Sequence, residues 1–535
     1  MRKSFVIIST LILIVTFGLA WFLSMNWYVL FAIFLVFTVM GYIDMFQTHH
    51  TIRRIYPLFG RLRYVLEDLR PKMYQYFIES DIDGRPFHRV DRSTIYQRAK
   101  NELQTIPFGT QFDVYAEGYE WMCHSVAPKA FETLNHDPRI IIGNKDCTQP
   151  YSASILNISA MSFGSLSGNA VEAFNAGAKI GGFAHNTGEG GISSHHLKHG
   201  GDLIWQIGTG YFGCRDEEGR FSPELFAEKA RIPSVKMIEL KISQGAKPGH
   251  GGILPASKNS EEIAKIRHVK PHTKVASPPF HSAFDTPLEM IQFIQRLREL
   301  SDGKPIGFKI CIGHKSEFIA ICKAMKHLDV YPDYIAIDGG EGGTGAAPQE
   351  FSNYVGAPMI DGLAFVQNVL MGMGIRHHVK LLASGKISSG FHIARAIALG
   401  ADACYSARAM MMAIGCIQAI LCNTNRCPTG ITTQDPKLTV GLVVEDKKVR
   451  LASYHQKVLE SFVELLGASG LDVAHNLTRS HIYRRVSLNE MITYEGLFPS
   501  VKTGSMLEGE IPEKYKDDFA NADMNRWGIH PQFSI

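Results

Sequence analysis

The chain has 535 residues, of which 45% are apolar and 20% are charged, and its formal net charge at pH 7 is +4. This composition is ordinary for a globular protein, and the length allows one large domain with an extension, or two domains. The small net charge, without a basic stripe that contains interleaved aromatic residues, gives no reason to expect a nucleic-acid partner.

The first 47 residues differ in character from the rest of the chain. Residues 5–23 carry no charge and residues 27–46 are apolar except for Asp44, and each stretch is long enough to cross a bilayer. Basic residues lie on both sides of this pair: Arg2, Lys3, Arg53, Arg54, Arg61, Arg63, Arg70 and Lys72. The positive-inside rule therefore predicts two transmembrane helices in residues 1–47, with the body of the chain in the cytoplasm. A cleaved signal peptide is the alternative, but a second apolar stretch follows at once.

Residues 48–150 are expected to form a helical and irregular lead-in segment, and a regular alternation begins at about residue 153. The predicted strands cover residues 154–161, 182–187, 235–242, 274–279, 305–312, 333–338, 379–385 and 403–408. The predicted helices between them include residues 287–300, 315–328, 361–375 and 391–400. Strands that read as continuous apolar runs are buried on both faces, and helical crossovers imply parallel pairing.

Eight such units fit a (β/α)8 barrel. Polar and glycine-rich residues follow nearly every strand, and in a barrel those loops converge on one face. This pattern favours the barrel over the alternative, a doubly wound open sheet. We assign the barrel to residues 151–475, with a helix at 454–470, and a C-terminal tail to residues 476–535.

Glycine-rich segments follow the late strands. The glycines of IDGGEGGTGAAP (337–348) let backbone N–H groups approach an anion or a flat ring. The next two strands end in ASGK and YSAR, and loops at these places in such barrels commonly bind phosphate. Gly385 and Arg408 are therefore candidates for holding a phosphate-bearing cofactor. Alternatively, the glycines serve loop geometry alone and Arg408 forms a surface ion pair.

Glu189 lies between two glycine-containing turns after the second predicted strand. A carboxylate on such a loop can act as an acid or base, or hold an ammonium or imine group. His195, His196 and His199 follow it, but without a paired metal-ligand spacing and a second carboxylate. We therefore expect these histidines to lie on a solvated loop.

Lysine side chains occur at two predicted strands. Lys241 ends an apolar strand, where a lysine is costly unless it faces an anion such as a dicarboxylate. Gln244 and Lys247 follow it, and Arg267 could supply a second cationic contact, although Lys247 and Arg267 could equally be surface charges. Lys309 ends a second strand, and a cation placed there could stabilise a reduced flavin.

Three cysteines lie close together in GCIQAILCNTNRCPTG (415–430): Cys416, Cys422 and Cys427. A cytoplasmic thiol is expected to be reduced, and a zinc site would need a fourth ligand. Three thiolates match a [3Fe–4S] cluster, and a [4Fe–4S] cluster with an outside ligand also fits. A lone catalytic Cys427 would leave the other two unexplained. The remaining cysteines are expected to serve packing: Cys123, Cys147, Cys214, Cys311, Cys322 and Cys404.

Taken together, these motifs resemble a known family. They are MSFGS (161–165), NTGEGG (186–191), QGAKPGHGG (244–252), SPPFH (277–281), DGGEGGTGA (338–346), ASGK (383–386) and the cysteine segment. Their order over about 155–475 resembles the FMN-binding synthase domain of glutamate synthases, and most of all its stand-alone, membrane-anchored members. The resemblance implies a (β/α)8 barrel with FMN and a [3Fe–4S] cluster. It also implies that 2-oxoglutarate and ammonia form 2-iminoglutarate, which reduced FMN converts to L-glutamate by hydride transfer.

The motifs and the resemblance together give the expected site. The catalytic residues are Glu189, Lys241 and Gln244, and the substrate-binding residues are Gly164, Ser165, Arg267 and Lys247. The FMN-binding residues are Met161, Ser162, Lys309, Asp338, Gly339, Gly340, Gly342, Gly343, Ser384, Gly385, Lys386, Ala407 and Arg408. Cys416, Cys422 and Cys427 are the expected cluster ligands.

The chain departs from the family pattern in three ways. The glutaminase domain of the large enzymes is not seen, Ile192 and Ser193 follow NTGEGG where those enzymes carry two acidic residues, and His250 replaces a glutamate. Ammonia is therefore expected from solution or a separate amidotransferase, unless the amino donor differs. Since no dinucleotide-binding fingerprint is seen, electrons are expected from a partner such as ferredoxin or a reductase.

Two other functions remain open at this stage. The first is a related flavin oxidoreductase that acts on another amino or keto acid, or relays electrons at the membrane. The second is a degenerate barrel with a binding role, against which Lys241, Glu189 and the three cysteines argue.

Overall fold

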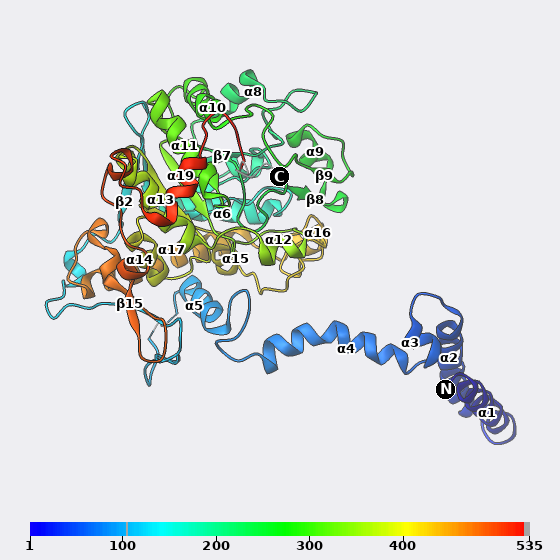
Figure 1. Cartoon of the computed structure of the whole chain (residues 1–535). Coiled ribbons are helices and arrows are strands. Elements are labelled where there is room, and N and C mark those ends of the chain that lie inside the picture. Colours follow the sequence, from blue (N-terminus) through cyan, green and yellow to red (C-terminus); the bar gives the residue numbers. More distant parts are fainter. Residues whose placement is uncertain (103–104, 529–535) are drawn as a thin grey trace, which may run out of the picture. The chain divides into compact units, whose positions relative to one another are not determined.

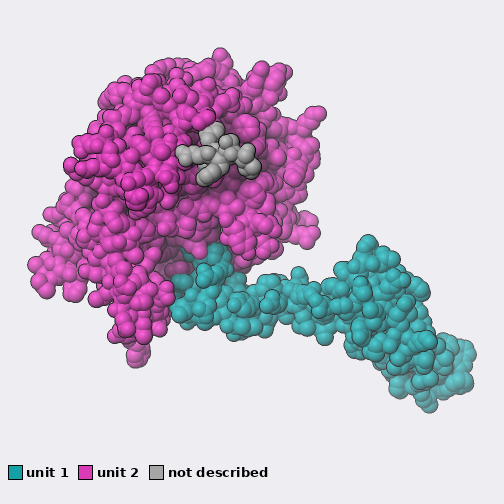
Figure 2. Space-filling model, viewed as in Figure 1, with its two compact units in different colours: residues 1–90 teal, residues 91–535 magenta. Residues whose placement is uncertain are grey.

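The computed structural model describes residues 1–102 and 105–528, which form two compact units, Met1–Val90 and Asp91–Ile535 (Figures 1 and 2). In the first unit, α1 (Arg2–Phe22) and α2 (Trp27–Phe46) pack against each other in opposite directions. Phe5 near the start of α1 contacts Tyr42 near the end of α2, with ring centroids 5.9 Å apart. Both helices are long and apolar enough to cross a membrane, as the sequence predicted. Short α3 (Thr51–Ile55), α4 (Gly60–Met73) and the π-helical turn η1 (Tyr74–Ile78) follow.

The second unit is built around a closed barrel of parallel strands, which confirms the predicted (β/α)8 fold and excludes the open sheet. In barrel order the strands are β4 (Leu156–Ile158), β5 (His185–Asn186), β6 (Leu203–Ile207), β7 (Val235–Lys241), β10 (Ile306–Ile310), β11 (Tyr334–Asp338), β12 (Lys380–Ser384) and β13 (Ala403–Ser406). Almost every residue in them is buried, as expected for parallel strands covered on both faces.

Helices surround this barrel (Figure 1). The longer ones are α5 (Arg89–Lys100), α6 (Gly168–Gly181), α8 (Pro223–Ala230), α10 (Pro287–Leu300), α11 (Lys315–Leu328), α13 (Met359–Gly372), α14 (Gly390–Ala398) and α17 (Val444–Ala468). The shorter ones are α7 (Ser194–Leu197), α9 (Glu261–Arg267), α12 (Gln349–Tyr354), α15 (Arg408–Ala413), α16 (Pro436–Thr439), α18 (Tyr494–Leu497) and α19 (Lys516–Asn521). Side-chain oxygens of Ser167, Thr286 and Ser389 accept hydrogen bonds from the first turns of α6, α10 and α14, which fixes where these helices begin.

One predicted barrel strand was wrong and another was missed. Within residues 274–279, only Val275–Ala276 (β9) is a strand, and it pairs antiparallel with β8 (Ile253–Leu254) outside the barrel. The third barrel strand is instead β6, which the sequence analysis did not identify. Gln206, the fourth of its five residues, breaks the apolar run, and the Gln206 side chain can be buried because it donates a hydrogen bond to Glu239. The helix predicted at 454–470 begins ten residues earlier, at Val444.

Two small antiparallel sheets complete the second unit. Strands β2 (Arg139–Ile142) and β3 (Tyr151–Ser154) pair with each other, and Ile142, Tyr151 and Ala153 join the buried cluster inside the barrel. The other sheet contains β1 (Glu120–Met122), β14 (Ile482–Arg485) and β15 (Met491–Thr493), and so links the lead-in to the tail.

Candidate active site

Two buried lysines lie side by side at the carboxyl ends of neighbouring strands. Lys241 in β7 and Lys309 in β10 are direct partners in the parallel pairing. Their exposed fractions are 8% and 4%, so neither ammonium group is freely hydrated. In a (β/α)8 barrel this face carries the functional loops. Burying a cation is costly unless it is paired, and each lysine has its own carboxylate.

Lys241 is held by two of the residues that the sequence analysis grouped with it. Its Nζ lies 2.9 Å from Glu189 Oε1 and donates a hydrogen bond of 3.3 Å to Gln244 Oε1. Gly208 and Gly252 make room for the Glu189 carboxylate, because a Cβ at either position would lie within 2.5 Å of its oxygens. Burial raises the pKa of Glu189, but the neighbouring cations, Lys241 above all, outweigh it and hold this pKa below its ordinary value.

Two further cations face the same carboxylate. Lys247 and Arg267 are 3% and 5% exposed, so the interpretation of them as surface charges is wrong. Both lower the pKa of Glu189 through their charge. Burial lowers the pKa of Lys247 to about 8 and that of Arg267 to about 10. Around Glu189 there are thus three cations and one carboxylate, a net charge of +2.

Arg267, the last residue of α9, connects this group to the MSFGS turn. Its Nη2 donates to the Phe163 carbonyl at 3.0 Å and to Ser162 Oγ at 3.5 Å, and its guanidinium lies over the Phe212 ring at 5.0 Å. Gly164 has φ +97°, and a Cβ there would lie 3.2 Å from Arg267 Nη2. A side chain at position 164 would therefore be strained and would press on the guanidinium.

Met161, Ser162 and Ser165, the other predicted site residues of the MSFGS turn, contact neighbouring segments. A Cβ at Gly188 would meet the backbone of Met161 and Ser162 at 2.6–3.0 Å, so the NTGEGG and MSFGS segments are in direct contact. The Ser165 carbonyl accepts a hydrogen bond of 3.0 Å from Lys258 Nζ.

A second ion pair occupies the centre of the same face. Lys309 Nζ lies 3.6 Å from Asp338 Oδ2, which also accepts a hydrogen bond from the Gly245 N–H at 2.9 Å. Ser384 Oγ donates to Asp338 Oδ1 at 2.7 Å. The predicted residues Lys309, Asp338 and Ser384 are therefore brought together at the ends of β10, β11 and β12.

The glycine-rich segment 339–343 packs against the ends of the last two strands. Arg408 Nη2 donates to the Glu341 carbonyl at 2.6 Å, and a Cβ at Gly343 would lie 2.7 Å from the Arg408 side chain. A Cβ at Gly340 would lie 2.7 Å from the Gly356 carbonyl, and one at Gly385 would lie 2.7 Å from Glu341 Oε1. Because these glycines have no side chain, their backbone can lie close to the Gly356 carbonyl, the Arg408 side chain and the Glu341 carboxylate. Ala407 precedes α15 as its N-cap residue, and Lys386 has φ +51°.

This donor set fits FMN. Lys309 and Arg408 supply cations at the ends of two strands, and the glycine-rich loops between them present backbone instead of side chains. A flat ring with an anionic phosphate requires both features.

The histidines after Glu189 do not lie on a solvated loop, so that prediction was wrong. They lie on or next to α7, and His196 is fully buried because its Nδ1 completes a reciprocal cap with Ser193. His195 Nδ1 lies 2.7 Å from Glu172 Oε1 on α6, and Lys198 bonds the other oxygen of that carboxylate at 2.7 Å. The capping requirement of a four-residue helix was not visible from the spacing of the histidines.

The three cysteines of the 415–430 segment differ in environment. Burial raises the pKa of the Cys416 thiol to about 11. Burial also raises that of Cys427, but hydrogen bonds from Thr429 and Thr432 outweigh it and lower this pKa to about 7. Cys422 and Cys427 both raise the pKa of Cys416 through their charge. Within residues 1–102 and 105–528, however, no three His, Cys, Asp or Glu side chains are gathered as metal ligands. The predicted cluster site therefore stays a prediction.

Hydrogen bonds attach this segment to the MSFGS turn and the start of α6. Lys258 Nζ donates to the Cys422 carbonyl at 2.8 Å as well as to that of Ser165. Ser167 Oγ donates to the Gly430 carbonyl at 2.7 Å. Of the cysteines expected to serve packing, Cys214, Cys311, Cys322 and Cys404 are buried, whereas Cys123 and Cys147 are partly exposed.

Sequence reasoning missed a carboxylate one layer deeper in the barrel. Glu239 is fully buried, and its oxygens accept hydrogen bonds from Gln206 (2.6 Å), Asn186 (2.9 Å) and Tyr405 (3.0 Å). Burial raises its pKa. The available signal was its position two residues before Lys241, since alternate residues of a strand point to the same side.

His281 was also missed as part of the site. Its Nε2 lies 2.8 Å from the Lys241 carbonyl, and its Nδ1 lies 3.0 Å from the Tyr211 hydroxyl. Burial lowers its pKa to about 4, so it is neutral and fixes the end of β7 by hydrogen bonds alone.

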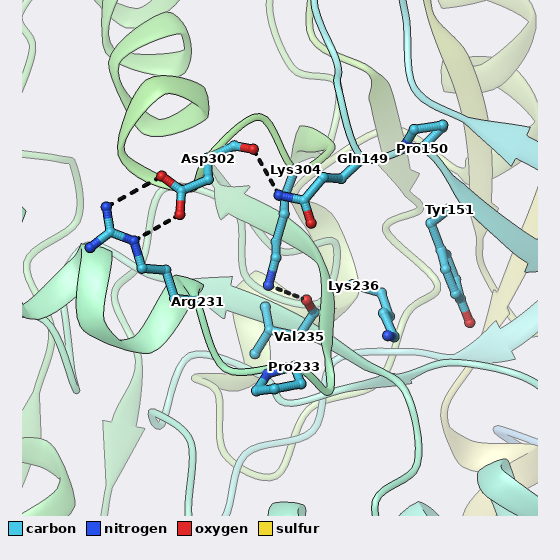
Figure 3. A pocket seen from close by; sticks show the side chains of 9 residues that line it. All are labelled: Gln149, Pro150, Tyr151, Arg231, Pro233, Val235, Lys236, Asp302 and Lys304. Carbon is cyan, nitrogen blue, oxygen red and sulfur yellow. Dashed lines mark hydrogen bonds and ion pairs between the residues drawn. The ribbon is translucent and has the colours of Figure 1, made fainter.

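The opposite end of the barrel holds a cavity of about 540 Å³ that is also lined by cations (Figure 3). Two of those cations bind groups of the protein. Lys304 Nζ donates to the carbonyls of Ala230, Ile232 and Val235 at 2.6–3.1 Å, and Arg231 pairs with Asp302 at 2.8 Å. The third, Lys236, lies on β7 five residues before Lys241.

The closed barrel and the ion-paired groups at its carboxyl end place the chain among (β/α)8-barrel proteins whose site lies at this face. The family is defined by sequence: the family model described as "Conserved region in glutamate synthase" matches residues 93–472. The chain therefore belongs to the glutamate synthase family of oxidoreductases.

Several relatives support this assignment. The chain is 37% identical over 490 residues to the glutamate synthase large subunit-like protein YerD of Bacillus subtilis, covering 84% of this chain and 93% of that protein. It is 35% identical over 336 residues to the archaeal glutamate synthase [NADPH] of Methanocaldococcus jannaschii, covering 62% of each. The match to the glutamate synthase [NADPH] large chain of Azospirillum brasilense is 31% identical and covers 60% of this chain but 21% of that one.

Solved structures are more distant. A flavocytochrome b2 variant has 11% identity and a TM-score of 0.43, with 84% of this chain and 91% of that chain covered. A mandelate oxidase variant has 15% identity and a TM-score of 0.39, with 75% and 98% covered. The barrel assignment rests on the strand order and not on these likenesses.

Proposed function

We propose that this chain is an FMN-dependent oxidoreductase that reduces 2-iminoglutarate, formed from 2-oxoglutarate and ammonia, to L-glutamate. The observation that carries the proposal is the group of Lys241, Lys247 and Arg267 around the single carboxylate Glu189. Its net charge of +2 matches a dicarboxylate substrate. In a site with low solvent access such complementarity decides which ligand binds.

The side chains have distinct roles in this proposal. Lys241 Nζ has three N–H groups, of which two point to Glu189 and Gln244, so one remains for the substrate. Arg267 is fixed by Phe163 and Phe212, and it would orient a substrate carboxylate. Lys247, held by the Ala346 carbonyl at 2.7 Å, would face the second carboxylate.

Glu189 and Lys241 would handle protons during the reaction. The lowered pKa of Glu189 keeps it ionised, so it can bind ammonia or hold the ammonium group that forms. Lys241 can donate a proton to the substrate, and Glu189, 2.9 Å from it, can return a proton that it takes from the incoming ammonium ion. FMN, when bound, supplies the hydride that the carbon of the imine receives. Lys309, Arg408 and the glycine-rich segment would hold the flavin, with Lys309 beside the ring and Arg408 towards the phosphate.

We also propose that Cys416, Cys422 and Cys427 hold a [3Fe–4S] cluster that receives electrons from a separate donor. The support is their spacing in the family pattern and the effect of the other two cysteines on the pKa of Cys416. The described side chains are not gathered as metal ligands, and the roles given above to Glu189, Lys241, Lys247 and Arg267 do not involve the cluster.

The remaining parts of the proposal concern location and partners. We propose that α1 and α2 anchor the chain in a membrane with its barrel in the cytoplasm, where basic residues flank the helices. The electron donor would be a ferredoxin or a separate reductase. The amino donor would be free ammonia or ammonia from a separate amidotransferase.

A product assay tests this function. The purified full chain is reconstituted anaerobically with FMN, ferrous iron and inorganic sulfide, and then given a chemical reductant, 2-oxoglutarate and ¹⁵N-labelled ammonia. The proposal predicts ¹⁵N-glutamate that depends on all three additions. Flavin binding without labelled glutamate, but with turnover of another keto acid, would favour the related oxidoreductase instead.

A further inference from the structure

The first unit contains an exposed apolar helix face that the proposed function does not use. Helix α4 stands apart from the α1–α2 pair, and no other helix of its unit covers it (Figure 1). The side chains of this face are 40–59% exposed: Leu62, Val65, Leu66, Leu69 and Met73. Large apolar side chains that share one exposed surface mark an interaction site.

These side chains form a continuous stripe along the helix. At about 100° per residue, positions 62, 65, 66, 69 and 73 fall within an arc of about 100°. In the π-helical turn that follows, Tyr76 and Phe77 are 60% and 77% exposed and extend the apolar surface.

The charged residues of α4 lie outside this stripe. On the same angular scale Arg61 and Lys72 border one edge, while Arg63 and Arg70 border the other. Of the two acidic residues of the helix, Glu67 lies opposite the stripe and Asp68 lies next to Arg61, about 60° beyond the nearer edge. Cations at both edges suit an apolar face immersed beneath negatively charged headgroups.

The start of α4 is fixed at the level where α2 ends. Arg61 Nε bonds Asp44 Oδ2 at 2.7 Å, and the Leu58 N–H donates to the same oxygen at 3.2 Å. The Asp44 side chain is only 2% exposed, and Asp44 precedes Phe46, the last residue of α2, by two positions. A spanning helix ends at the membrane–water boundary, so this ion pair holds the first turn of α4 at that boundary.

We propose that α4 lies in the headgroup region of an anionic bilayer, with Leu62, Val65, Leu66, Leu69 and Met73 buried among the acyl chains. This inference rests on the membrane anchorage proposed above. A second copy of the helix is a poor occupant of the stripe, because both edges carry cations and either orientation of a pair would bring like charges together. Arg61 and Arg63 already pair with Asp44 and Glu67 at 2.7 Å, and a bilayer with acidic lipids covers the apolar stripe and brings anionic headgroups to Lys72 and Arg70 at its two edges.

Photocrosslinking in the full chain tests the proposal. p-Benzoylphenylalanine replaces Leu66 on the apolar face in one variant and Asp68 on the polar face in a matched control. Each chain is inserted into vesicles of phosphatidylcholine with phosphatidylglycerol and irradiated. Lipid adducts on the peptide that contains residue 66, and few on the control, are the expected result.

Other products would overturn the proposal in identifiable ways. Crosslinked dimers from position 66 would show that a second copy covers the stripe, and crosslinks to residues 91–528 would show that the chain covers it itself. If alkaline carbonate extracts the chain from the vesicles, the membrane anchorage fails. If the chain resists extraction but position 66 yields no lipid adducts, only the inference about α4 fails.

Charge variants add a second measurement. Arg70→Gln combined with Lys72→Gln should lower the lipid adduct yield at position 66 severalfold in anionic vesicles, with little change in neutral ones. Glu67→Gln combined with Asp68→Asn changes the same number of charges on the polar face and should not lower it. Equal losses from both pairs would contradict the role of the basic edges.

Discussion

The Lys241 group and the cysteine segment were both predicted from sequence as functional sites, but within the part of the chain that the structure describes only the Lys241 group is assembled. Lys241 Nζ already lies within 3.3 Å of polar atoms of both Glu189 and Gln244. Cys422 and Cys427 raise the pKa of Cys416 through their charge, but the described residues contain no assembled set of metal ligands.

The difference follows from what positions each set. Lys241 is the last residue of a buried strand, and Glu189 is confined by Gly208 and Gly252, so the barrel itself fixes them. The cysteines lie on a loop with left-handed backbone at Gln418, Ile420 and Asn425, without regular hydrogen-bonded pairing. A site held by strands is organised by folding, whereas a loop site is completed by the group that it binds.

The largest loss of activity is expected from a substitution at Lys241. Lys241→Met leaves Glu189 buried without its nearest cation, so kcat/KM for glutamate formation should fall by about 10²- to 10³-fold. Lys236→Met is the control, because Lys236 lies on the same strand but lines the cavity at the opposite end (Figure 3). Parental activity in the Lys241 variant would remove the basis of the proposed site.

The second change tests whether the cysteine segment is a metal site at all. Cys422→Ser should lower the iron content per chain by about tenfold while the FMN spectrum is retained, since the two groups have separate ligands. Reduction by a protein donor should be lost and reduction by a chemical reductant kept. Cys123→Ser, at a partly exposed cysteine outside the segment, is the matched control. Unchanged iron and unchanged reduction by the donor would reject the cluster.

The third change separates charge from geometry. Arg267→Lys keeps a cation but loses the contact with the Phe212 ring and the directed bond to the Phe163 carbonyl. KM for 2-oxoglutarate should rise by about tenfold with a smaller change in kcat, because Arg and Lys are not equivalent at such positions. An unchanged KM would mean that Arg267 supports the fold of the MSFGS turn without binding substrate.

The smallest effect concerns pH. Burial lowers the pKa of Lys247 to about 8, so its charge is lost as the pH rises through 8. KM for the dicarboxylate should therefore increase severalfold between about pH 7 and 9. Between pH 8 and the ordinary lysine value of 10.5 the unfolded chain binds more protons at this site, so Lys247 makes stability rise with pH there. Lys247→Arg should flatten the KM profile, and a parental profile in that variant would assign the titration to another group.

The sequence predicted the barrel well because its strands are apolar runs separated by helices with clear ends. Helices α10 and α11 have the predicted bounds, 287–300 and 315–328. The errors arose where polar residues lie inside the core or apolar ones outside it. Strand β6 was missed because Gln206 interrupts its apolar run, and the partner that allows Gln206 to be buried, Glu239, is distant in sequence. Residues 274–279 were wrongly predicted as a barrel strand because Val275 and Ala276 form a strand outside the barrel.

Contacts between residues distant in sequence also limited the prediction of the site. Glycine-rich loops and lysines at strand ends were recognisable from local sequence. The hydrogen bonds of Glu239 and His281 join residues from different strands and loops, so local sequence gave no sign of them. The burial of His196 depends on its role in capping α7, and the neighbouring residues did not predict this helix.

The central claim is that the group around Lys241 directs a dicarboxylate imine to a bound flavin. The most direct measurement is stopped-flow absorbance of the anaerobic, FMN-loaded full chain after reduction and mixing with 2-oxoglutarate and ammonia. We predict that the flavin is reoxidised when both are present, and that neither compound alone, nor the Lys241→Met variant, gives this reaction at the parental rate. A reduced flavin that stays reduced with both substrates present would contradict the account.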